Sequence, residues 1–389
     1  MTSAKITLIG CMAAVMAFIA GGGETDRIKV KAVNPLNEGR DNETVCIDLK
    51  ASPALLQFSQ GAKASVYSEH LKEFILCQSL DNDGDGKNDE VIFQADFEPV
   101  QTQEFYITDS NEKGDVNVAC RTNAMFVPQR KDDFAWENDR IAFRVYGPEL
   151  QRTELTSSGI DVWVKSVKYP VMEKLYSKGH DYYHSDNGEG SDFYTVGKSL
   201  GCGGLGAWHD NRLWRSENFV SWKIITNGPI RSVFELTYKP WQLGAKTSGE
   251  KKRISLDLGS NFNQIESFFD GDVNDTVPAV GVVESAGGGN AVFGPDKTWL
   301  GYWQNADGGN GSIGCAVILP KEAARNDSVT ADNHNILLAR LNGRGSVVYY
   351  AGACWNRSAD FDSEEKWLKH IQKKARLIES PLKIEVLSE

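Results

Sequence analysis

Residues 179–210 form a stretch in which histidine, tyrosine and carboxylate side chains are concentrated. Three of the six histidines of the chain, His180, His184 and His209, lie in it, and Tyr183 stands next to His184. Glycines are frequent and no long apolar run is present, so packing in a hydrophobic core does not explain this composition. We therefore predict a long functional loop that supplies groups for proton transfer.

β-Elimination from a uronic acid is one reaction for which the chain has suitable side chains. A base removes the proton at C5 of the sugar while a cation or an amide donor neutralises the carboxylate. Histidine and tyrosine can act as the base, and arginine and asparagine can neutralise the charge. The candidates for these roles are Asn138, Arg140, Arg144, His180, Tyr183, His184 and His209.

Glycoside hydrolysis is the other reaction, and it needs two carboxyl groups that flank the bond. These groups lie about 5–5.5 Å apart in retaining enzymes and about 6.5–9.5 Å apart in inverting enzymes. The available carboxylates are Glu137, Asp139, Asp161, Asp186, Glu189 and Asp192. The sequence leaves both reactions open, and across the two the catalytic candidates are Glu137, Arg140, His180, Tyr183, His184 and His209.

Aromatic and polar residues of the same region are predicted to bind the sugar. Tryptophan faces stack on sugar rings, while amide, carboxylate and cationic groups hydrogen-bond to hydroxyls. This prediction requires folding to bring His180, His184, His209 and the segment 137–140 to the mouth of one groove. The substrate-binding candidates are Trp136, Asn138, Arg144, Trp163, Lys165, Asp186, Glu189, Tyr194 and Trp208.

Structural roles are the alternative for these residues. A histidine can be a hydrogen-bonded structural residue, and residues 136–140 can form a buried ion-pair network that holds two sheets together. A transition-metal site at His180 and His184 is disfavoured, because that spacing makes a site on a helix and the intervening residues do not indicate one.

An acidic turn is the candidate metal site. Asp81, Asp83, Asp85 and Asp89 surround two glycines in the segment LDNDGDGKNDEV. This spacing collects hard oxygen ligands on one side of a tight turn, as calcium loops do. The alternative is a β-hairpin turn rich in Asp, Asn and Gly for conformational reasons. In either case we expect a structural role, and we expect no organic cofactor.

The overall charge is acidic, at −11 for 389 residues, and the basic residues are scattered. Nucleic-acid binding is therefore not expected, because neutralising phosphates requires a cluster of Lys and Arg. Residues 1–23 have the basic start, apolar run and small residues of an export signal, which predicts a periplasmic or extracellular protein. No later segment is apolar enough to span a membrane. Of the six cysteines after Cys11, several are expected to be buried free thiols, with one or two disulfides left open.

Short alternating apolar and polar runs, separated by Gly, Asn and Asp turns, dominate the chain. Their spacing of about 8–12 residues predicts an all-β fold of stacked antiparallel sheets, a β-sandwich or supersandwich. Only residues 363–377 have a helical pattern, with Ser363 as the N-cap. A change of character near residue 125 divides the chain into an N-terminal β-sandwich segment, 24–125, and a second domain, 126–389, that carries the site.

Several segments together resemble the bacterial family called domain of unknown function 4861. They are DDFAWENDRIAFRVYGPELQ, GIDVWVK, YHSDNGEGSDFYTVGKSLGCGG, NGPIRSVFELTY, LDNDGDGKNDEVIFQ and the closing AGACWNRS and EEKWLKHI. The resemblance implies an exported protein associated with bacterial breakdown of pectin and related plant polysaccharides. The run from NGPIRSVFEL to NFNQIE is also similar to galactose-mutarotase-like supersandwich proteins, which include many polysaccharide lyases.

Three functional hypotheses follow. The first is an enzyme that acts on acidic plant oligosaccharides through residues 132–210. The second is a non-catalytic periplasmic glycan-binding protein in which tryptophans form a stacking platform. The third is a structural partner in an exported complex. In the first two an oligosaccharide is the partner, and the oligomeric state is open.

Overall fold

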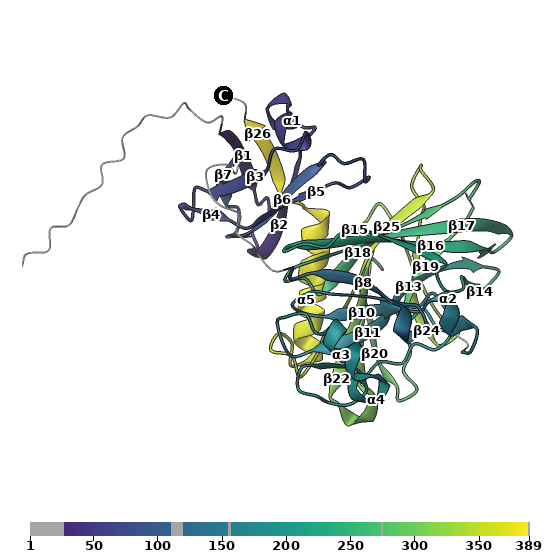
Figure 1. The fold of residues 1–389 in the computed structure, drawn as a ribbon. Coiled ribbons are helices and arrows are strands. Elements are labelled where there is room, and N and C mark those ends of the chain that lie inside the picture. The colour runs from purple at the N-terminus through teal and green to yellow at the C-terminus, as the bar shows by residue number, and fades with distance from the viewer. Residues whose placement is uncertain (1–26, 110–119, 155–156, 274, 388–389) are drawn as a thin grey trace, which may run out of the picture.

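The computed structural model describes residues 27–109, 120–154, 157–273 and 275–387. The predicted export signal, residues 1–23, lies outside the described residues. Within them the strands are antiparallel, as predicted, and they assemble into five sheets. Figure 1 shows a smaller N-terminal body next to a larger one, with the helix α5 (Glu364–Glu379) beside both.

Two sheets pack face to face in the N-terminal sandwich. Every second residue of β1 points into the core, where Val30, Val45, Phe93 and Phe105 are almost completely buried. One sheet has the order β26 (Lys383–Leu387), β1 (Ile28–Val33), β7 (Thr102–Asp109), β3 (Ala64–Ser68) and β4 (Glu73–Ile75). The other has the order β2 (Arg40–Asp48), β6 (Glu90–Phe97) and β5 (Cys77–Leu80).

The last strand of the described chain belongs to this sandwich. β26 pairs antiparallel with β1, so that Lys29 lies opposite Leu387 and Val33 lies opposite Lys383. Residues 383–387, which the sequence analysis groups with the second domain, therefore complete the N-terminal sheet. The helix α5 leads directly into this strand, so the chain returns to the N-terminal body after building the larger one (Figure 1).

An eight-stranded sheet is the centre of the larger body. Its order is β15 (Ser221–Thr226), β16 (Arg231–Leu243), β17 (Lys246–Asp257), β18 (Phe262–Phe269), β25 (Ser346–Trp355), β22 (Ser312–Ile318), β21 (Trp299–Asn305) and β20 (Gly289–Phe293). A five-stranded sheet beside it has the order β14 (Arg212–Arg215), β13 (Cys202–His209), β19 (Pro278–Val283), β24 (His334–Ala339) and β23 (Ala324–Ala331).

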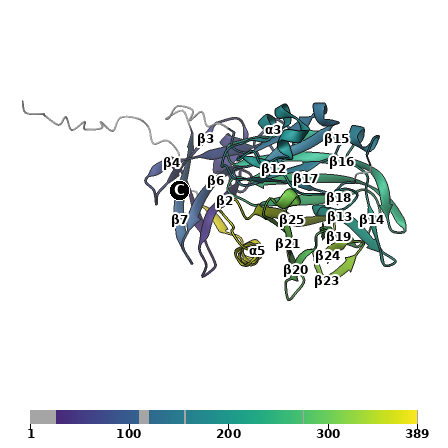
Figure 2. The same cartoon turned by 90° about the horizontal axis from the view of Figure 1, so that it is seen from below.

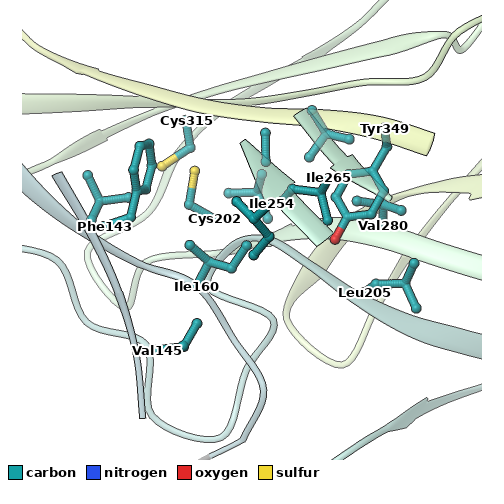
Figure 3. Packing of buried hydrophobic residues seen from close by; sticks show 14 of the residues in the cluster. Phe143, Val145, Ile160, Cys202, Leu205, Ile254, Ile265, Val280, Cys315 and Tyr349 are labelled. Carbon is teal, nitrogen blue, oxygen red and sulfur yellow. The ribbon is translucent and has the colours of Figure 1, made fainter. Parts of the chain in front are cut away.

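The fifth sheet is small and carries the candidate site. Its order is β12 (Gly190–Asp192), β11 (Asp161–Lys165), β10 (Ala142–Val145), β9 (Asp133–Glu137) and β8 (Asn123–Val127). One core joins it to the two larger sheets, because all three contribute apolar side chains to the same cluster. Figure 3 shows part of this cluster, with Phe143 and Val145 from β10, Cys202 and Leu205 from β13, and Ile254, Ile265 and Tyr349 from the eight-stranded sheet.

The prediction of one long loop over residues 179–210 is wrong, because the structure has the helix α4 (His180–Tyr183), β12 and β13 in this stretch. The glycines of β13, which obscure the strand pattern in the sequence, allow the backbones of β13 and β25 to approach closely. Gly203 has a φ of +84°, and a Cβ atom there would lie 2.2 Å from the Cβ of Ala351 on β25. The sequence analysis did not expect a strand because glycine lowers strand propensity.

Helices are short except for α5. They include α1 (Leu56–Ser59), α2 (Pro148–Gln151) and α3 (Met172–Lys178), with 3₁₀ turns at Pro53–Leu55, Pro128–Arg130 and Asp307–Gly309. Among the described residues, no helix has the length and apolar character needed to cross a membrane. Of the cysteines in strand-like apolar runs, Cys315 is a buried free thiol, as the sequence predicts, whereas Cys46 and Cys77 are half-buried free thiols. Cys202 and Cys354 are also buried free thiols.

The predicted helix at 363–377 is confirmed as α5, and its apolar face packs on the outer side of the eight-stranded sheet. The hydroxyl of Ser363 accepts a hydrogen bond from the backbone N–H of Lys366, which caps the first turn. Trp367 is fully buried, stacks on Phe262 with 5.5 Å between ring centroids, and donates its indole N–H to the carbonyl of Cys315.

Replacing Trp367 with alanine is expected to lower the free energy of unfolding by about 3–5 kcal/mol, because it leaves a cavity between α5 and the sheet. Urea unfolding followed by circular dichroism measures the change. Lys369→Ala removes an exposed side chain from the same helix, and this control should shift the free energy by less than about 0.5 kcal/mol. Equal small effects of the two changes would show that α5 does not contribute to the core.

Candidate functional site

The small sheet β8–β12 has one apolar face and one ionisable face. Because side chains alternate along a strand, Trp136, Phe143 and Val162 point into the main core. The opposite face carries six ionisable residues, which are Asp133 and Glu137 on β9, Arg144 on β10, Asp161 and Lys165 on β11, and Asp192 on β12. Strand register places Arg144 directly opposite Asp161, so these charges meet on one surface.

Two short helices cover this ionisable face. α3 and α4 pack on it through Leu175, Tyr176 and Tyr183, which contact Trp163 in a second apolar cluster. The helices are joined at Gly179, whose φ of +90° favours glycine. The face is therefore closed off by the segment that the sequence analysis singles out for its histidines and tyrosines.

Arg144 is the centre of the buried cluster. Its Nη2 atom lies 2.5 Å from Oδ2 of Asp161 and 2.6 Å from Oδ2 of Asp192, and its Nη1 atom lies 3.6 Å from Oδ2 of Asp133. The guanidinium also lies over the ring of Trp163, 5.0 Å from the centroid. One cation thus faces three carboxyl groups, and several donors together with a stacked guanidinium suit arginine rather than lysine.

Burial changes the proton affinity of these carboxyl groups. Loss of hydration raises the pKa of Asp133 to about 7, that of Asp161 to about 7 and that of Asp192 to about 6, although Arg144 acts in the opposite direction on all three. The neighbouring carboxyl group of Asp192 raises the pKa of Asp161 further. Around neutral pH the three groups therefore share protons rather than carrying three full charges.

Some polar atoms in the cluster have no partner. Among the described residues, Oδ1 of Asp133, Oδ1 of Asp192 and Nη1 of Arg144 are buried without a hydrogen bond. Buried polar groups are nearly always hydrogen-bonded, so unpaired ones indicate a place where another polar molecule binds. Both a donor and two acceptors are available there.

His184 connects this cluster to the surface. Its Nδ1 lies 3.1 Å from the carbonyl oxygen of Asp192 and its Nε2 lies 3.6 Å from Oδ2 of the same residue, while 38% of its side chain is exposed. Partial burial lowers the pKa of His184, with further contributions from His180 and Arg144. The imidazole is therefore neutral at pH 7 and can accept a proton.

Tyr183 lies beneath His184, in the same wall of the site. It is buried, its ring contacts Trp163, and its hydroxyl accepts a hydrogen bond of 3.0 Å from Nε of Arg130. His180 lies on the outside of α4, and its ring centroid is 4.3 Å from that of His184. The helix that the sequence analysis did not expect therefore brings His180, Tyr183 and His184 together.

Glu137 and Lys165 form a separate and fully paired unit on the same face. Nζ of Lys165 donates to Glu137 at 2.6 Å, and the carboxylate also accepts the backbone N–H groups of Val171 and Met172 at the start of α3. Burial lowers the pKa of Lys165 while Glu137 acts in the opposite direction. This unit anchors α3 to the sheet, which is a structural role.

The turn between β9 and β10 directs the next candidates away from Arg144. Asn138 donates to the carbonyls of Asp257, at the end of β17, and Ser260, in the loop that follows. Arg140 forms an ion pair with Asp360, near the start of α5. The segment 137–140 therefore joins sheets and helix, as the ion-pair alternative in the sequence analysis describes.

Four further candidates lie outside the Arg144 cluster. Trp136 and Tyr194 are buried on the core side of the sheet, where Trp136 donates its indole N–H to Asn263 at 2.7 Å. His209 stands at the end of β13 against Gly244 of the β16–β17 hairpin. Trp208 precedes it and packs on a third apolar cluster. The structure therefore does not bring His209 and Arg140 together with His184 in one groove.

Two acidic candidates form surface ion pairs. Asp186 lies 3.3 Å from Nη1 of Arg357. Glu189 pairs with Lys174 of α3 and accepts a hydrogen bond of 2.6 Å from the hydroxyl of Tyr169. Both contacts hold the loop after α4 in place, at the edge of the covered face.

Four residues of the cluster were not among the candidates. Asp133, Tyr146 and Tyr176 surround Arg144, and Arg130 binds Tyr183. A period-two signal was present, since Asp133 and Glu137, and then Asp161 and Lys165, repeat a charged side chain on one face of otherwise apolar strands. Such a pattern indicates a sheet face that is polar and covered at the same time.

The acidic turn forms the end of the β5–β6 hairpin. Oxygens of Asp81, Asp83 and Asp89 lie within 4.8 Å of one another, and Asp85 is not part of this group. Each carboxylate also accepts a backbone N–H of the turn, for example Gly84 and Gly86 to Asp81. The hydrogen bonds account for the turn conformation, and calcium binding by the three carboxylates stays a prediction.

Comparison with known proteins confirms the family resemblance. The family model described as "Domain of unknown function (DUF4861)" matches residues 33–384. "Uncharacterized protein P7" of Formosa agariphila is 35% identical over 338 residues, which cover 83% of this chain and 84% of that protein.

Two solved structures from Enterococcus faecalis have a similar fold. An alpha-mannosidase of strain V583 superposes with a TM-score of 0.52 at 9% identity, covering 93% of this chain and 46% of that one. A protein in the glycosyl hydrolase family 38 superposes with a TM-score of 0.50 at 8% identity, covering 93% of this chain and 47% of that one. The chain spans about half the length of both, and at this identity the likeness shows the fold alone.

The raised pKa of Asp133 predicts how stability depends on pH. A carboxyl group in an unfolded chain titrates at about 3.9, so between that pH and about 7 the folded protein binds more protons than the unfolded one. The resulting stability is fully present below pH ~4 and is lost as pH rises through 7, by up to about 1.4 kcal/mol per pH unit for each proton.

Asp133→Asn cannot titrate and should flatten this decline, as measured by urea unfolding between pH 4 and pH 8. Asp181→Asn changes a fully exposed carboxylate on α4 and should leave the slope unchanged. A slope that is the same in the Asp133→Asn and wild-type proteins would contradict the assignment.

Proposed function

The chain belongs to the DUF4861 family, and from the geometry of its covered sheet face we propose that it is an exported enzyme that hydrolyses glycosidic bonds in acidic, pectin-type plant oligosaccharides. One observation carries the proposal: Asp161 and Asp192 both bind the same nitrogen of Arg144, at the point where the cluster reaches the surface beside His184. The likeness in fold to a mannosidase supports action on sugars in general.

The two carboxyl groups are too close together for an inverting mechanism. Because their Oδ2 atoms lie 2.5 and 2.6 Å from one nitrogen, these oxygens are at most ~5 Å apart, well below the ~6.5–9.5 Å of inverting glycosidases, so a retaining mechanism, with carboxyl groups ~5–5.5 Å apart, is the one we propose. The pKa of Asp161 is raised to about 7 and that of Asp192 to about 6. We assign Asp192, which lies beside the partly exposed His184, as the carboxylate that attacks the sugar, and Asp161 as the proton donor to the leaving oxygen.

Substrate entry requires α3 and α4 to move, because they cover both carboxyl groups. Gly179 joins the two helices with a positive φ, and no atom lies within 4 Å of a Cβ placed there, so the backbone has room to turn. Movement of this cover exposes the rings of Trp163 and Tyr183, on which a sugar can stack. Arg130, released from Tyr183, supplies a cation for a uronate.

Product analysis on pectin oligosaccharides tests the reaction class. Hydrolysis gives new reducing ends without absorbance at ~235 nm, whereas elimination gives that absorbance. Saturated and unsaturated oligosaccharides and a neutral galactan should be compared, and faster cleavage of the acidic substrates is expected. Absence of cleavage on every acidic glycan would contradict the proposal.

β-Elimination is the second candidate, and the position of His184 favours it. This imidazole is partly exposed and neutral, so it can remove a proton, and Arg130 and Arg144 lie nearby to neutralise a carboxylate. Absorbance at ~235 nm that disappears in His184→Ala would select this reaction over hydrolysis.

A non-catalytic glycan-binding protein is the alternative outside enzymology. The complete burial of Asp161 and Asp192 under α3 and α4 favours it, because a structural cluster needs no access for substrate. Saturable sugar binding without turnover, unchanged in His184→Ala, would select this alternative.

Asp192→Asn is expected to lower kcat by about 10²–10⁴-fold while oligosaccharide binding is retained, since the amide cannot replace the attacking carboxylate. Initial rates of reducing-end formation and calorimetric binding constants measure the two quantities. Asp181→Asn, on the exposed side of α4, is the matched control and should keep wild-type kcat. A kcat within twofold of wild type in Asp192→Asn would remove Asp192 from the mechanism.

A further inference from the structure

A cavity of about 450 Å³ lies where the N-terminal sandwich meets the larger body. Its walls come from β2, from β17 and β18 with the loop between them, and from one side of α5. Figure 2 shows α5 end-on beside β2 and β21. The volume is within the ~300–1,000 Å³ of small-molecule pockets, which often form at domain interfaces. No residue of the Arg144 cluster lines it.

Most charged side chains of this cavity are already paired across its walls. Such pairs neutralise each other and leave little net field for a ligand. They are Arg231 with Asp257 through hydrogen bonds of 2.5 and 2.7 Å, Lys373 with Asp41 at 3.0 Å, and Glu43 with Arg40 at 3.0 Å.

One cationic group in the wall has donors to spare. Lys374 makes no ion pair or hydrogen bond with any described residue. Arg140 also lines the cavity, but it pairs with Asp360 through Nη1, and its buried Nε lies 3.8 Å from Oδ2 of Asp139. The cavity therefore offers one ammonium group with which an anion can pair.

The surroundings of His370 show the same positive bias. Burial lowers the pKa of His370 to about 4, and Lys374, Lys373 and Arg140 lower it further. The imidazole is neutral at pH 7, and the carboxylate of Asp360 acts on its pKa in the opposite direction to the three cations. An anion bound among these groups reduces the repulsion between the cations.

The remaining wall suits a polyhydroxylated ring. Phe361 and His370 lie 4.9 Å apart between ring centroids and present aromatic surface, which packs on the C–H faces of sugars. Ser255 and Gln264, paired across β17 and β18, add a hydroxyl and an amide for hydrogen bonding to sugar hydroxyls.

We infer that this cavity binds a small sugar acid, with its carboxylate at Lys374 and its ring against Phe361 and His370. A monoanion fits better than a phosphate dianion, because Lys374 is the one unpaired full charge among the described lining residues. This site is distinct from the proposed catalytic face and uses none of its residues. The inference goes beyond the proposed function and stands whether or not the protein hydrolyses glycosides.

Histidine-selective NMR of the full chain tests the site directly. The chain has only six histidines, and His370→Gln identifies the signal of the cavity. Galacturonate should shift the His370 signal saturably, while galactose, which lacks the carboxylate, and acetate, which lacks the ring, should bind at least about tenfold more weakly.

Lys374→Gln should raise the Kd for galacturonate by about tenfold or more, because a charge-assisted hydrogen bond is lost. Lys369→Gln, on the exposed side of the same helix, is the control and should leave the Kd within about twofold of wild type. An unmoved His370 signal, equal binding of galactose or acetate, or an unchanged Kd in Lys374→Gln would each overturn the inference. None of these results depends on turnover, so failure here and failure of the hydrolase proposal are separate outcomes.

Discussion

The contact of Arg144 with Asp161 and Asp192 is the interaction on which the site depends. Removing a guanidinium and three carboxyl groups from water is costly, and mutual attraction repays the cost only when the geometry is close and hydrogen-bonded. Arg144 meets this condition with two carboxylates at 2.5 and 2.6 Å, whereas Asp133 lies farther away at 3.6 Å. One guanidinium cannot balance three buried carboxylates. Burial therefore raises the pKa of each carboxyl group, which favours its protonated form.

The position of these charges follows from the way the small sheet is packed. Its apolar face packs against the large core. The opposite face is therefore exposed to water unless other elements cover it. α3 and α4 provide the cover, and the carboxylate of Glu137 holds the start of α3 through the backbone N–H groups of Val171 and Met172. The closed polar face has a buried interior, where electrostatic interactions are strong, and the half-exposed His184 lies at its edge.

The two ends of β10 serve different regions of the molecule. Arg144 points into the face beneath α3 and α4, while Arg140, in the turn before β10, reaches Asp360 and the cavity beside α5. α5 then leads to β26, which completes the N-terminal sheet. The segments that connect the two bodies therefore also line the cavity beside α5. A ligand bound in this cavity would contact both bodies.

The sequence by itself determined the architecture and the family. Alternation of apolar and polar residues is a local property of each strand, which is why the antiparallel sheets, the helix at 363–377 and the buried free thiol at Cys315 could be predicted. Arg144, Tyr183 and His184 could also be singled out from the sequence, because charged and aromatic residues stood out in an otherwise apolar or glycine-rich context.

Only the tertiary structure decided which of the candidates meet. The glycines of β13 made this strand hard to recognise from the sequence. One of them, Gly203, is required by close packing against Ala351, which is far away in the sequence. The separation of His209 and Arg140 from His184 depends on the direction of a turn and on strand order, and neither leaves a local signal. Convergence of side chains is a property of long-range pairing. The pairing of β9 with β10, of β10 with β11 and of β11 with β12 placed three carboxyl groups around one arginine.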